Sequence, residues 1–433
     1  MEQYKVSGSK TFTVRSWNNK SIFTGEPANT QAIHTNLEDW TQAAERRIVT
    51  PFSRSNIINQ DGAAWRHSRD LINPLFKRAE LDDVERFKKF VDRMITLIPR
   101  DESTVDMHPL LRKLFLDSSS EFCFGESIDS LRDRTGQADA FIAAFNRATT
   151  GDGKRIHPTR TFRKLMFKYT KDDEWMADVK IVHDYIDRCI ARHRDTNADM
   201  TAKQRKGYFI LKGMSKDVSD PVELRFQLLG IFSTARELTA MAFANTLFLL
   251  ARQPDLWQEL RAEAQGLGGK APTSFEELKS IPLFRYTIME ALRVRSPIVL
   301  TRRQAARDTV LPRGGGPDGS SPVLIPKGSM VWCDKYANTR ETTTWGPDLD
   351  TFRPSRFEGK KLGWEFTPFS GGPRICPANQ QVISQCVYLL LRLVQEFESI
   401  ENRDPVFGFK ETLMMCIESR NGCEIALHPN NGV

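Results

Sequence analysis

The chain has 433 residues and carries 62 Lys and Arg against 55 Asp and Glu, which gives a net charge of +7. No stretch of about 18 consecutive apolar residues occurs, so the sequence offers no candidate for a bilayer-spanning helix. Its seven cysteines are odd in number and lack paired spacing, which indicates a reducing compartment rather than a disulfide framework, and no nucleic-acid-binding motif accompanies the positive charge.

Hydrophobic periodicity and capping residues divide the chain into predicted helices and strands. In chain order, helices are expected near residues 62–77, 81–98, 106–124, 136–147, 173–195, 222–252, 254–265, 274–295 and 378–397, and short strands within 10–34, 299–333 and 408–428. The length alone suggests two or three domains, but large enzymes with a single core depart from that rule. Because no linker interrupts the chain, we expect one catalytic domain over residues 1–433.

The densest stretch of Gly and Pro, residues 312–322, lies between two short apolar runs. This arrangement is typical of two strands joined by a loop. The stretch has three consecutive glycines, but it lacks the following helix and the Lys-Ser/Thr pair of a phosphate-binding loop. It therefore predicts a hairpin rather than a nucleotide site.

Near the C-terminus, residues 366–380 form a Gly-rich loop that presents Cys376 just before a long apolar helix. Gly371 and Gly372 permit a tight turn and a close approach to a flat cofactor. The backbone amides at the start of the helix favour an anionic sulfur. A thiolate presented in this way is a suitable axial ligand for haem iron. The alternative is that Cys376 is an ordinary cysteine in a buried turn.

This loop resembles the haem-binding loop of the cytochrome P-450 family, whose pattern is Phe-x-x-Gly-x-Arg-x-Cys. The matching residues are Phe369, Gly372, Arg374 and Cys376, and Ala378 stands where many members have glycine. The resemblance implies a haem b cofactor with Cys376 as the axial ligand of the iron. It also implies a mainly α fold with a small β lobe, in which a long central helix crosses the haem.

Two further segments resemble parts of the same family. Glu290 and Arg293 are three residues apart on a predicted helix, so they share a face and can pair. Farther along the chain, residues 345–357 resemble the family's meander, in which Arg356 would complete a cluster with that pair. The resemblance gives this cluster a structural role, in locking the loop behind the haem. The alternative is a set of ordinary surface ion pairs.

Cations at three family positions are expected to bind the haem propionates. Trp65 and Arg69 are four residues apart on a predicted helix, so both side chains can point to one propionate. Arg303 stands at a second family position, although the neighbouring Arg302 can serve equally well. Arg374, in the cysteine loop, is the third. The alternative is that these are solvated charges.

The central helix near 222–252 departs from the family at its most reactive position. Relatives carry the pattern Ala/Gly-Gly-x-Asp/Glu-Thr there, and the acid and the alcohol relay protons for dioxygen activation. In this chain the acid is Glu237, but the alcohol position holds Leu238. Thr239 lies about 100° farther around the helix, so it takes that position only through a local bulge.

Three explanations for Leu238 are open, besides simple core packing. In the first, Thr234, Ser233 or an ordered water delivers protons together with Glu237, and the candidate catalytic residues are Glu237, Thr234 and Thr239. In the second, the enzyme uses peroxide or catalyses a redox-neutral rearrangement, dehydration or cyclisation. In the third, the chain is a haem-bound scaffold or binding protein. The intact thiolate loop and the acid argue against this last explanation.

By position in the family, the substrate pocket is expected to have a mainly apolar lining, which suits a lipid, a terpenoid or another hydrophobic molecule. Four segments contribute: the loop before Trp65, the central helix, the turn after Arg293 and a C-terminal hairpin. The predicted contacts are Phe52, Ile57, Ile58, Phe232, Thr234, Leu238, Ile298, Val299, Leu300, Leu413, Met414 and Met415.

The resemblance implies a monooxygenase that inserts one atom of dioxygen into a hydrophobic small molecule. The hairpin at 312–322 resembles that of the fungal branch that hydroxylates alkanes and fatty acids. Electrons are expected from NADPH through a flavoprotein reductase, which the basic residues near Trp65 can attract. The membrane anchor and hinge of eukaryotic relatives are missing. We therefore expect either a trimmed chain from the cytosolic face of the endoplasmic reticulum or a soluble cytoplasmic protein.

Overall fold

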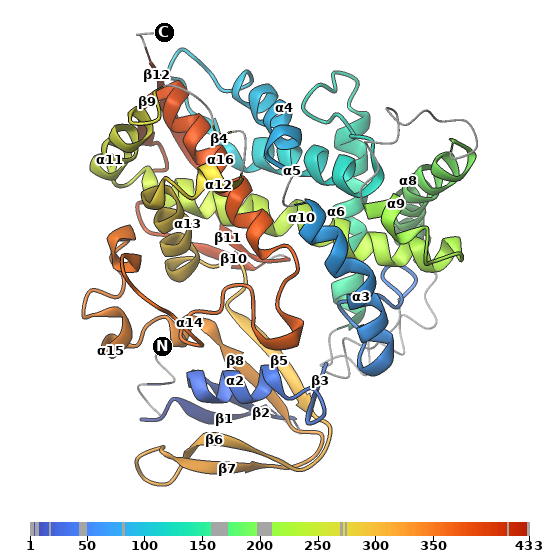
Figure 1. Ribbon diagram of the computed structural model, residues 1–433, viewed down its shortest axis with the longest axis vertical. Coiled ribbons are helices and arrows are strands. Elements are labelled where there is room, and N and C mark those ends of the chain that lie inside the picture. The colour runs from blue at the N-terminus through green and yellow to red at the C-terminus, as the bar shows by residue number, and fades with distance from the viewer. Residues whose placement is uncertain are drawn as a thin grey trace. The chain divides into compact units, whose positions relative to one another are not determined.

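The structure, a computed structural model, describes residues 4, 8–16, 19–42, 50–79, 83–156, 172–196, 210–268, 272, 275–413 and 415–430. Helices predominate in this part of the chain and the strands form small sheets (Figure 1), which confirms the predicted mainly α fold with a small β portion. The chain groups into two compact units, residues 1–44 with 282–379 and residues 45–281 with 380–433. The single catalytic domain over residues 1–433 stays a prediction.

The first unit is built on a five-stranded sheet with the strand order β1-β2-β8-β5-β3. These strands are β1 (Thr11–Ser16), β2 (Asn19–Thr24), β3 (Trp40–Thr41), β5 (Leu300–Ala305) and β8 (Met330–Asp334). Strands β2 and β8 run parallel, whereas the other neighbours are antiparallel. A separate hairpin, β6 (Thr309–Gly315) and β7 (Ser321–Ile325), matches the one predicted around the Gly-rich stretch.

The core of this unit gathers apolar side chains from the sheet, the hairpin and helix α2 (Pro27–Thr35). Its buried members are Ile22, Ile33, Trp40, Ala305, Leu311, Ile325, Val331 and Cys333. The unit also contains α13 (Pro282–Val294), α14 (Lys335–Asn338), α15 (Thr342–Trp345) and the 3₁₀ turns η3 (Pro354–Phe357) and η4 (Gly372–Arg374).

The second unit is mainly helical. Its helices are α3 (Gly62–Ala79), α4 (Asp83–Ile95), α5 (Met107–Phe124), α6 (Gln137–Ile156), α8 (Asp173–Thr196), α9 (Ile210–Met214), α10 (Pro221–Leu250), α11 (Pro254–Gln265), α12 (Phe275–Leu278) and most of α16 (Asn379–Glu396). Its strands are β4 (Val105–Asp106), β9 (Phe397–Asn402) and β12 (Glu424–Pro429) in one sheet, and β10 (Glu411–Leu413) with β11 (Ile417–Ser419) in a hairpin.

The 30-residue helix α10 lies alongside α5 (Figure 1). Most of its residues are buried around the whole circumference, as expected of a helix at the centre of a large core. The Asp220 carboxylate caps its first turn by accepting hydrogen bonds from the N–H groups of Val222 and Glu223. Pro221 occupies the first helical position, where no N–H group is needed.

Several sequence predictions need correction. The span 10–34 contains not only strands but also helix α2, whose first residue is Pro27, a residue that favours a helix start. The helix expected over 274–295 is interrupted, and α13 begins afresh at Pro282 because proline cannot continue a preceding helix. Strand β9, which follows α16 directly, was not predicted.

Helix α6 extends to Ile156, well beyond the predicted end at residue 147. Gly151 lies within this extension and allows the side chain of Trp175 to approach, since a Cβ at this position would lie 2.1 Å from the indole nitrogen. That nitrogen donates a hydrogen bond to the carbonyl of Ala148 at 3.0 Å. The glycine therefore serves a helix contact rather than a turn.

Among the described residues, no helix is both long enough and apolar enough to cross a membrane.

Replacing the capping residue of α10, Asp220→Ala, should lower the free energy of unfolding by about 1 kcal/mol, because two amide groups lose their acceptor. Urea unfolding followed by circular dichroism measures the change. The control is Asp217→Ala, which removes an exposed aspartate outside the helix and should leave stability unchanged within about 0.5 kcal/mol. Equal losses in the two variants would contradict the capping role.

Candidate functional site

Cys376 lies at the end of a tight loop that its own backbone closes. The N–H group of Cys376 donates to the carbonyl of Phe369 at 3.0 Å, and that of Ile375 donates to the carbonyl of Gly372 at 3.1 Å. Gly372 has a φ of 64°, in the left-handed region that favours glycine. The loop thus holds Cys376 in a fixed backbone conformation immediately before α16.

Two close approaches fix this loop within its unit. A Cβ atom on Gly372 would lie 2.4 Å from the carbonyl oxygen of His34 at the end of α2. A Cβ atom on Gly371 would lie 2.4 Å from the ring of Trp364, which is itself 6.2 Å from the ring of His34. The loop therefore packs against α2 and Trp364 at distances that only glycine permits.

His34 joins this packing as an uncharged side chain. Its Nδ1 lies 2.8 Å from the carbonyl oxygen of Thr30, which can only accept, so Nδ1 carries the proton and donates. Nε2 is then the acceptor for the hydroxyl of Thr301 at 3.4 Å. Burial lowers the pKa of His34 to about 3, and the nearby charge of Arg303 adds to this effect. His34 therefore connects α2 to β5 without carrying charge at neutral pH.

Among the seven cysteines, all of which are described by the structure, Cys376 alone is not buried. Burial raises the pKa of each of the other six thiols, to about 12 for Cys333 and Cys386. These six are therefore protonated and enclosed by protein. A haem ligand needs a thiolate with an open side, so the donor set fits the cofactor at Cys376 only.

The cations predicted to bind propionates have different surroundings. Arg303 is buried and donates from Nη1 to the amide oxygen of Gln42 at 3.2 Å, whereas Arg302 lies over the ring of Trp332 at 5.1 Å. Arg374 is half-buried. The two arginines of β5 therefore point to opposite faces of the strand.

The remaining predicted propionate residues belong to the second unit. Trp65 is buried and Arg69 is half-buried on α3. In the first unit, Phe369 and Ala378 stand at the two ends of the cysteine loop, and both are half-buried.

Glu290, Arg293 and Arg356 come together as the sequence predicted they would, in a cluster with side chains no more than 1% exposed. Arg293 binds both carboxylate oxygens of Glu290, at 2.7 and 2.8 Å, and Arg356 binds one of them at 3.2 Å. The N–H group of Arg353 donates to the same carboxylate at 3.1 Å. The cluster thus ties α13 to η3 and to the segment before it.

Helix α10 presents one half-exposed stripe. Thr234, Ala235 and Leu238 lie on it, whereas Glu237 and Thr239 are buried. The hydroxyl of Thr234 donates to the carbonyls of its own helix, at 3.1 Å to Gly230 and 3.0 Å to Ile231. Thr234 and Leu238 are one turn apart and share a face, whereas Thr239 lies about 100° farther around the helix than Leu238.

Glu237 belongs to a buried carboxylate network, which we define as Arg112, Glu237 and Glu418. Nε of Arg112 donates to Glu237 Oε1 at 3.0 Å, and Nη2 of Arg112 donates to Glu418 Oε2 at 2.5 Å. Burial alone lowers the pKa of Arg112, but the two carboxylates reverse this and raise it. Arg112 and Glu418 could not be predicted from the sequence, since no local pattern connects residues 306 positions apart.

Cys416 lies beside this network. Its sulfur and one oxygen of each glutamate lie within 4.8 Å of one another, a grouping that can in principle hold a metal ion. Arg112 already supplies a cation to both carboxylates, and burial raises the pKa of the Cys416 thiol. The donor set is therefore that of a hydrogen-bonded ion network rather than a metal centre.

The predicted substrate residues fall into two groups. Phe232 is completely buried between Phe124 and Phe145, at ring distances of 5.1 and 5.5 Å, and belongs to the aromatic core of the second unit. Phe52 is also buried. The half-exposed or exposed members are Ile57, Ile58, Thr234, Leu238, Leu413 and Met415 in the second unit and Ile298, Val299 and Leu300 in the first; Met414 lies outside the described residues.

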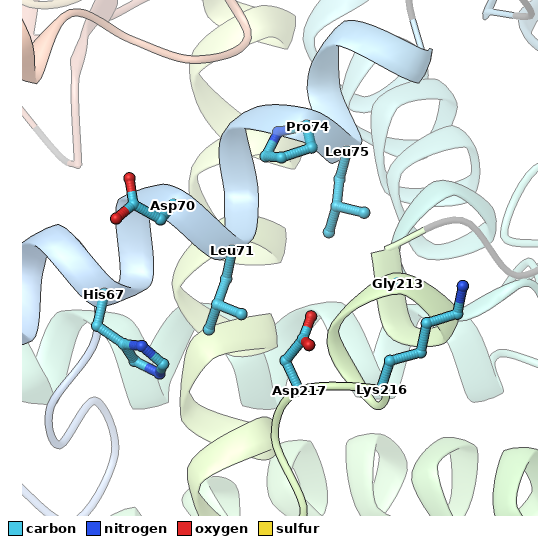
Figure 2. A pocket seen from close by; sticks show the side chains of 8 residues that line it. All are labelled: His67, Asp70, Leu71, Pro74, Leu75, Gly213, Lys216 and Asp217. Atoms are coloured by element: carbon cyan, nitrogen blue, oxygen red, sulfur yellow. The ribbon is translucent and has the colours of Figure 1, made fainter.

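A pocket of about 320 Å³ lies between α3 and the segment that contains α9 (Figure 2). Its lining residues are His67, Asp70, Leu71, Pro74, Leu75, Gly213, Lys216 and Asp217. The residues from α3 follow a different face of that helix from Trp65 and Arg69. Its charged side chains are exposed, so we assign it no role in the site.

Comparison with known proteins identifies relatives along almost the whole chain. A family model described as cytochrome P-450 matches residues 1–421. The chain is 33% identical over 436 residues to the cytochrome P-450 monooxygenase himC of Aspergillus japonicus, covering 98% of this chain and 77% of that protein. It is 31% identical to the monooxygenase fsdH of Fusarium heterosporum (96% and 75% covered) and 33% identical to iccC of Talaromyces variabilis (97% and 84%).

Gly372→Ala should destabilise the protein by about 3 kcal/mol, because strain at positive φ adds to overlap with the His34 carbonyl. The matched control is Gly359→Ala, which has a similar φ of 66° but open space around the new methyl group. It should cost about 1 kcal/mol, from strain alone. Urea unfolding compares the two, and equal costs would contradict the packing of the loop on α2.

Glu290→Gln should cost about 3–5 kcal/mol, since two buried guanidinium groups lose their only shared carboxylate charge. The expected result is a sharp fall in the yield of soluble folded protein. Asp348→Asn is the control, because this aspartate also binds Arg356 but its side chain is 32% exposed. A Glu290→Gln protein as stable as the control would show that the cluster is dispensable.

Proposed function

Because the chain belongs to the cytochrome P-450 family, we propose that Cys376 is the thiolate through which it binds the haem of that family. The chain is an enzyme of the haem-thiolate monooxygenase class. The observation that carries the assignment to Cys376 is that it alone among the seven cysteines is not enclosed by protein. Its place in a closed loop before α16 supports the same choice.

Haem bound through a thiolate supplies the centre at which dioxygen is reduced and one oxygen atom is transferred to a substrate. The residues that would hold its propionates are Arg374, Trp65 and Arg69, together with an arginine of β5. Of the two candidates on that strand we choose Arg303. It shares a strand face with Thr301, which contacts the His34 side chain behind the cysteine loop, whereas Arg302 lies over Trp332.

On α10, Glu237 is the residue proposed to take up and release protons, and the hydroxyl of Thr234 is proposed to pass them on along the half-exposed stripe. Leu238, at the family's alcohol position, lies on that stripe but has no group that can exchange a proton. Thr239 is 4% exposed and lies about 100° around the helix from Leu238, so it takes the alcohol position only through a bulge of the helix. The proposal therefore rests on Glu237, Thr234 and ordered water.

The proposed substrate is a hydrophobic small molecule such as a fatty acid, a terpenoid or another secondary metabolite. Support comes from the apolar, incompletely buried residues at the predicted contact positions, among them Ile57, Ile58 and Leu238 in the second unit and Ile298 and Val299 in the first. Such a lining provides burial for an apolar ligand but few hydrogen bonds.

The proposed electron donor is an NADPH-dependent flavoprotein reductase. Arg66 and Lys77 are exposed on α3, where positive charge favours an acidic partner. The proposed location is the cytosolic face of the endoplasmic reticulum where an anchor is present, and the cytoplasm otherwise.

One observation favours a second candidate function. Because Leu238 replaces the alcohol of the proton relay, the chain is also suited to a redox-neutral rearrangement, dehydration or cyclisation, or to the use of peroxide. Haem-loaded enzyme should be incubated with a mixture of fatty acids and terpenoids in three ways: with reductase and NADPH, with peroxide alone, and with neither. Product that requires NADPH and dioxygen supports the monooxygenase, whereas product formed with neither oxidant excludes it for that reaction.

Cys376→Ser should abolish the red-shifted Soret band that the ferrous carbonyl complex of a haem thiolate gives, because serine does not supply a thiolate. Cys386→Ser, which changes a buried cysteine of α16 in the same way, should retain the band. Difference spectra of the reduced, carbon monoxide-treated proteins provide the measurement. Retention of the band in Cys376→Ser would mean that another residue binds the iron.

Leu238→Thr should lower the amount of hydrogen peroxide released per NADPH consumed if the missing hydroxyl limits proton delivery. Leu238→Val is the matched control, since valine has the shape of threonine without the hydroxyl. Peroxide and NADPH are measured together in the haem-loaded enzyme with reductase. The same ratio in both variants would mean that Leu238 is a packing residue and that protons arrive by another route.

A further inference from the structure

The residues before α3, at positions 50–60, form a series of turns in the second unit, which we call the pre-α3 segment. It carries Ile57 and Ile58, two of the predicted substrate contacts, and both are half-buried. A segment without helix or strand has no regular ladder of backbone hydrogen bonds. Its shape therefore depends on side-chain hydrogen bonds and on packing.

Asn56 is the residue around which the turn of the pre-α3 segment is built, and it is only 3% exposed. Its side-chain oxygen accepts from the N–H group of Ile58 at 2.9 Å, and its side-chain nitrogen donates to the carbonyl of Ser53 at 3.0 Å. Its carbonyl accepts from the N–H groups of Asn59 and Gln60, both at 3.1 Å. Its own N–H group donates to Oδ1 of Asn59 at 2.8 Å. Each polar group of Asn56 thus makes a hydrogen bond within the segment.

The Asn56 side chain also packs against α10, at Gly230. A Cβ atom on Gly230 would lie 3.0 Å from Cγ of Asn56, whereas carbon atoms pack at about 3.5–4.0 Å. Gly230 is one helical turn before Thr234, whose hydroxyl donates to the Gly230 carbonyl at 3.1 Å, and Leu238 is one turn farther along. Asn56 therefore lies against the side of α10 that carries Thr234 and Leu238.

Buried polar groups of three helices hold the two ends of the pre-α3 segment. At its start, the hydroxyl of Thr50 donates to the carboxylate of Asp152 on α6. At its end, Oε1 of Gln60 accepts from the hydroxyl of Ser68 on α3 at 2.6 Å, and the side-chain amide of Gln227 on α10 donates to that hydroxyl at 2.6 Å. Buried polar networks of this kind specify one arrangement, so the segment has a defined position on α3, α6 and α10.

We propose that Asn56 is a positioning residue that holds the turn at Ile57 and Ile58 against the Gly230 side of α10, and that it thereby determines how well the site accepts an apolar ligand. The inference rests on the proposed substrate contacts. The polar groups of Asn56 are engaged within the segment, so it acts through the two isoleucines. A turn that already has its final shape binds more tightly, because the ligand does not have to order it.

The test uses haem-loaded enzyme and two ligands that bind iron through the same ring nitrogen, imidazole and 1-dodecylimidazole. Both shift the Soret band when they bind, and titration gives a dissociation constant for each. Only the second ligand carries an apolar chain, so the ratio of the two constants reports on the apolar lining. In the wild type, 1-dodecylimidazole should bind more tightly than imidazole by about tenfold or more.

Asn56→Ala should reduce this preference by about tenfold, because Ile58 and Ser53 lose their partners and the turn is no longer preformed. Imidazole itself should bind as in the wild type. The matched control is Asn29→Ala in the first unit, since the Asn29 side chain has no exposed surface and also bonds backbone groups, those of Arg313. It should retain the wild-type preference. A general loss of stability would affect both ligands equally and leave the ratio unchanged.

Gly230→Ala changes the same turn from α10 without removing a hydrogen bond. Alanine favours a helix more than glycine does, so the variant should fold. Its methyl group should displace Asn56 and reduce the preference by about threefold. The matched control is Gly153→Ala on α6, where the methyl group meets open space and the preference should be unchanged. When Gly230→Ala is combined with Asn56→Ala, the preference should equal that of Asn56→Ala alone, because the methyl group then has room.

Ile58→Ala separates the inference from the proposed contacts. A reduced preference in this variant supports the contact, and a wild-type preference in either Asn56→Ala or Gly230→Ala would then overturn the positioning role alone. Effects of Asn56→Ala and Gly230→Ala that add in full would also overturn it, because the two residues would act independently. A wild-type preference in Ile58→Ala would remove the proposed contact and the inference with it. Imidazole that leaves the wild-type Soret band unchanged would overturn the proposed haem site, on which both depend.

Discussion

The Glu290 carboxylate is the interaction on which the cysteine-bearing unit depends. It has no exposed surface, and it accepts hydrogen bonds from Arg293, Arg356 and the backbone of Arg353. A buried charge of this kind is tolerated only when its partners are all in place, so α13, η3 and the segment between them have to adopt one arrangement. Cys376 follows that segment in the chain and is held by its own backbone and by α2.

Buried carboxylates are also paired with arginine in the second unit, but in a different arrangement. The Glu290 cluster joins one carboxylate to two guanidinium groups, and these side chains are no more than 1% exposed. Because water cannot replace a lost partner there, the cluster is either intact or broken. In the carboxylate network two carboxylates compete for Arg112, and both retain some exposure. One partner belongs to a small hairpin with an open end. A cation shared between two carboxylates suits a group that exchanges protons, and a closed cluster suits a scaffold.

The sequence predicted those parts of the site that local spacing encodes. The pair Glu290 and Arg293 follows from helical periodicity, and the loop around Cys376 follows from its glycines and the helix after it. The predicted helices depart most from the structure where a proline or glycine has a role that hydrophobic periodicity does not show. Pro27 and Pro282 begin helices, and Gly151 lies inside one.

Contacts between distant segments could not be predicted. Arg112 looks like any arginine of an amphipathic helix, and nothing in the sequence pairs it with Glu418. The approach of Gly372 to His34 is likewise a tertiary contact without a local signal. Phe232 was expected at the substrate because of its place on the central helix, but a helix that is apolar on all sides gives no indication of which residues face the core.

The central claim is that this haem-thiolate enzyme transfers an atom of dioxygen to an organic molecule. Incubation of the haem-loaded protein with reductase, NADPH and a hydrophobic substrate mixture under ¹⁸O-labelled dioxygen, followed by mass spectrometry, tests it most directly. The account predicts that each product molecule gains one ¹⁸O atom while the other atom leaves as water. Products that form without any label from dioxygen would contradict it.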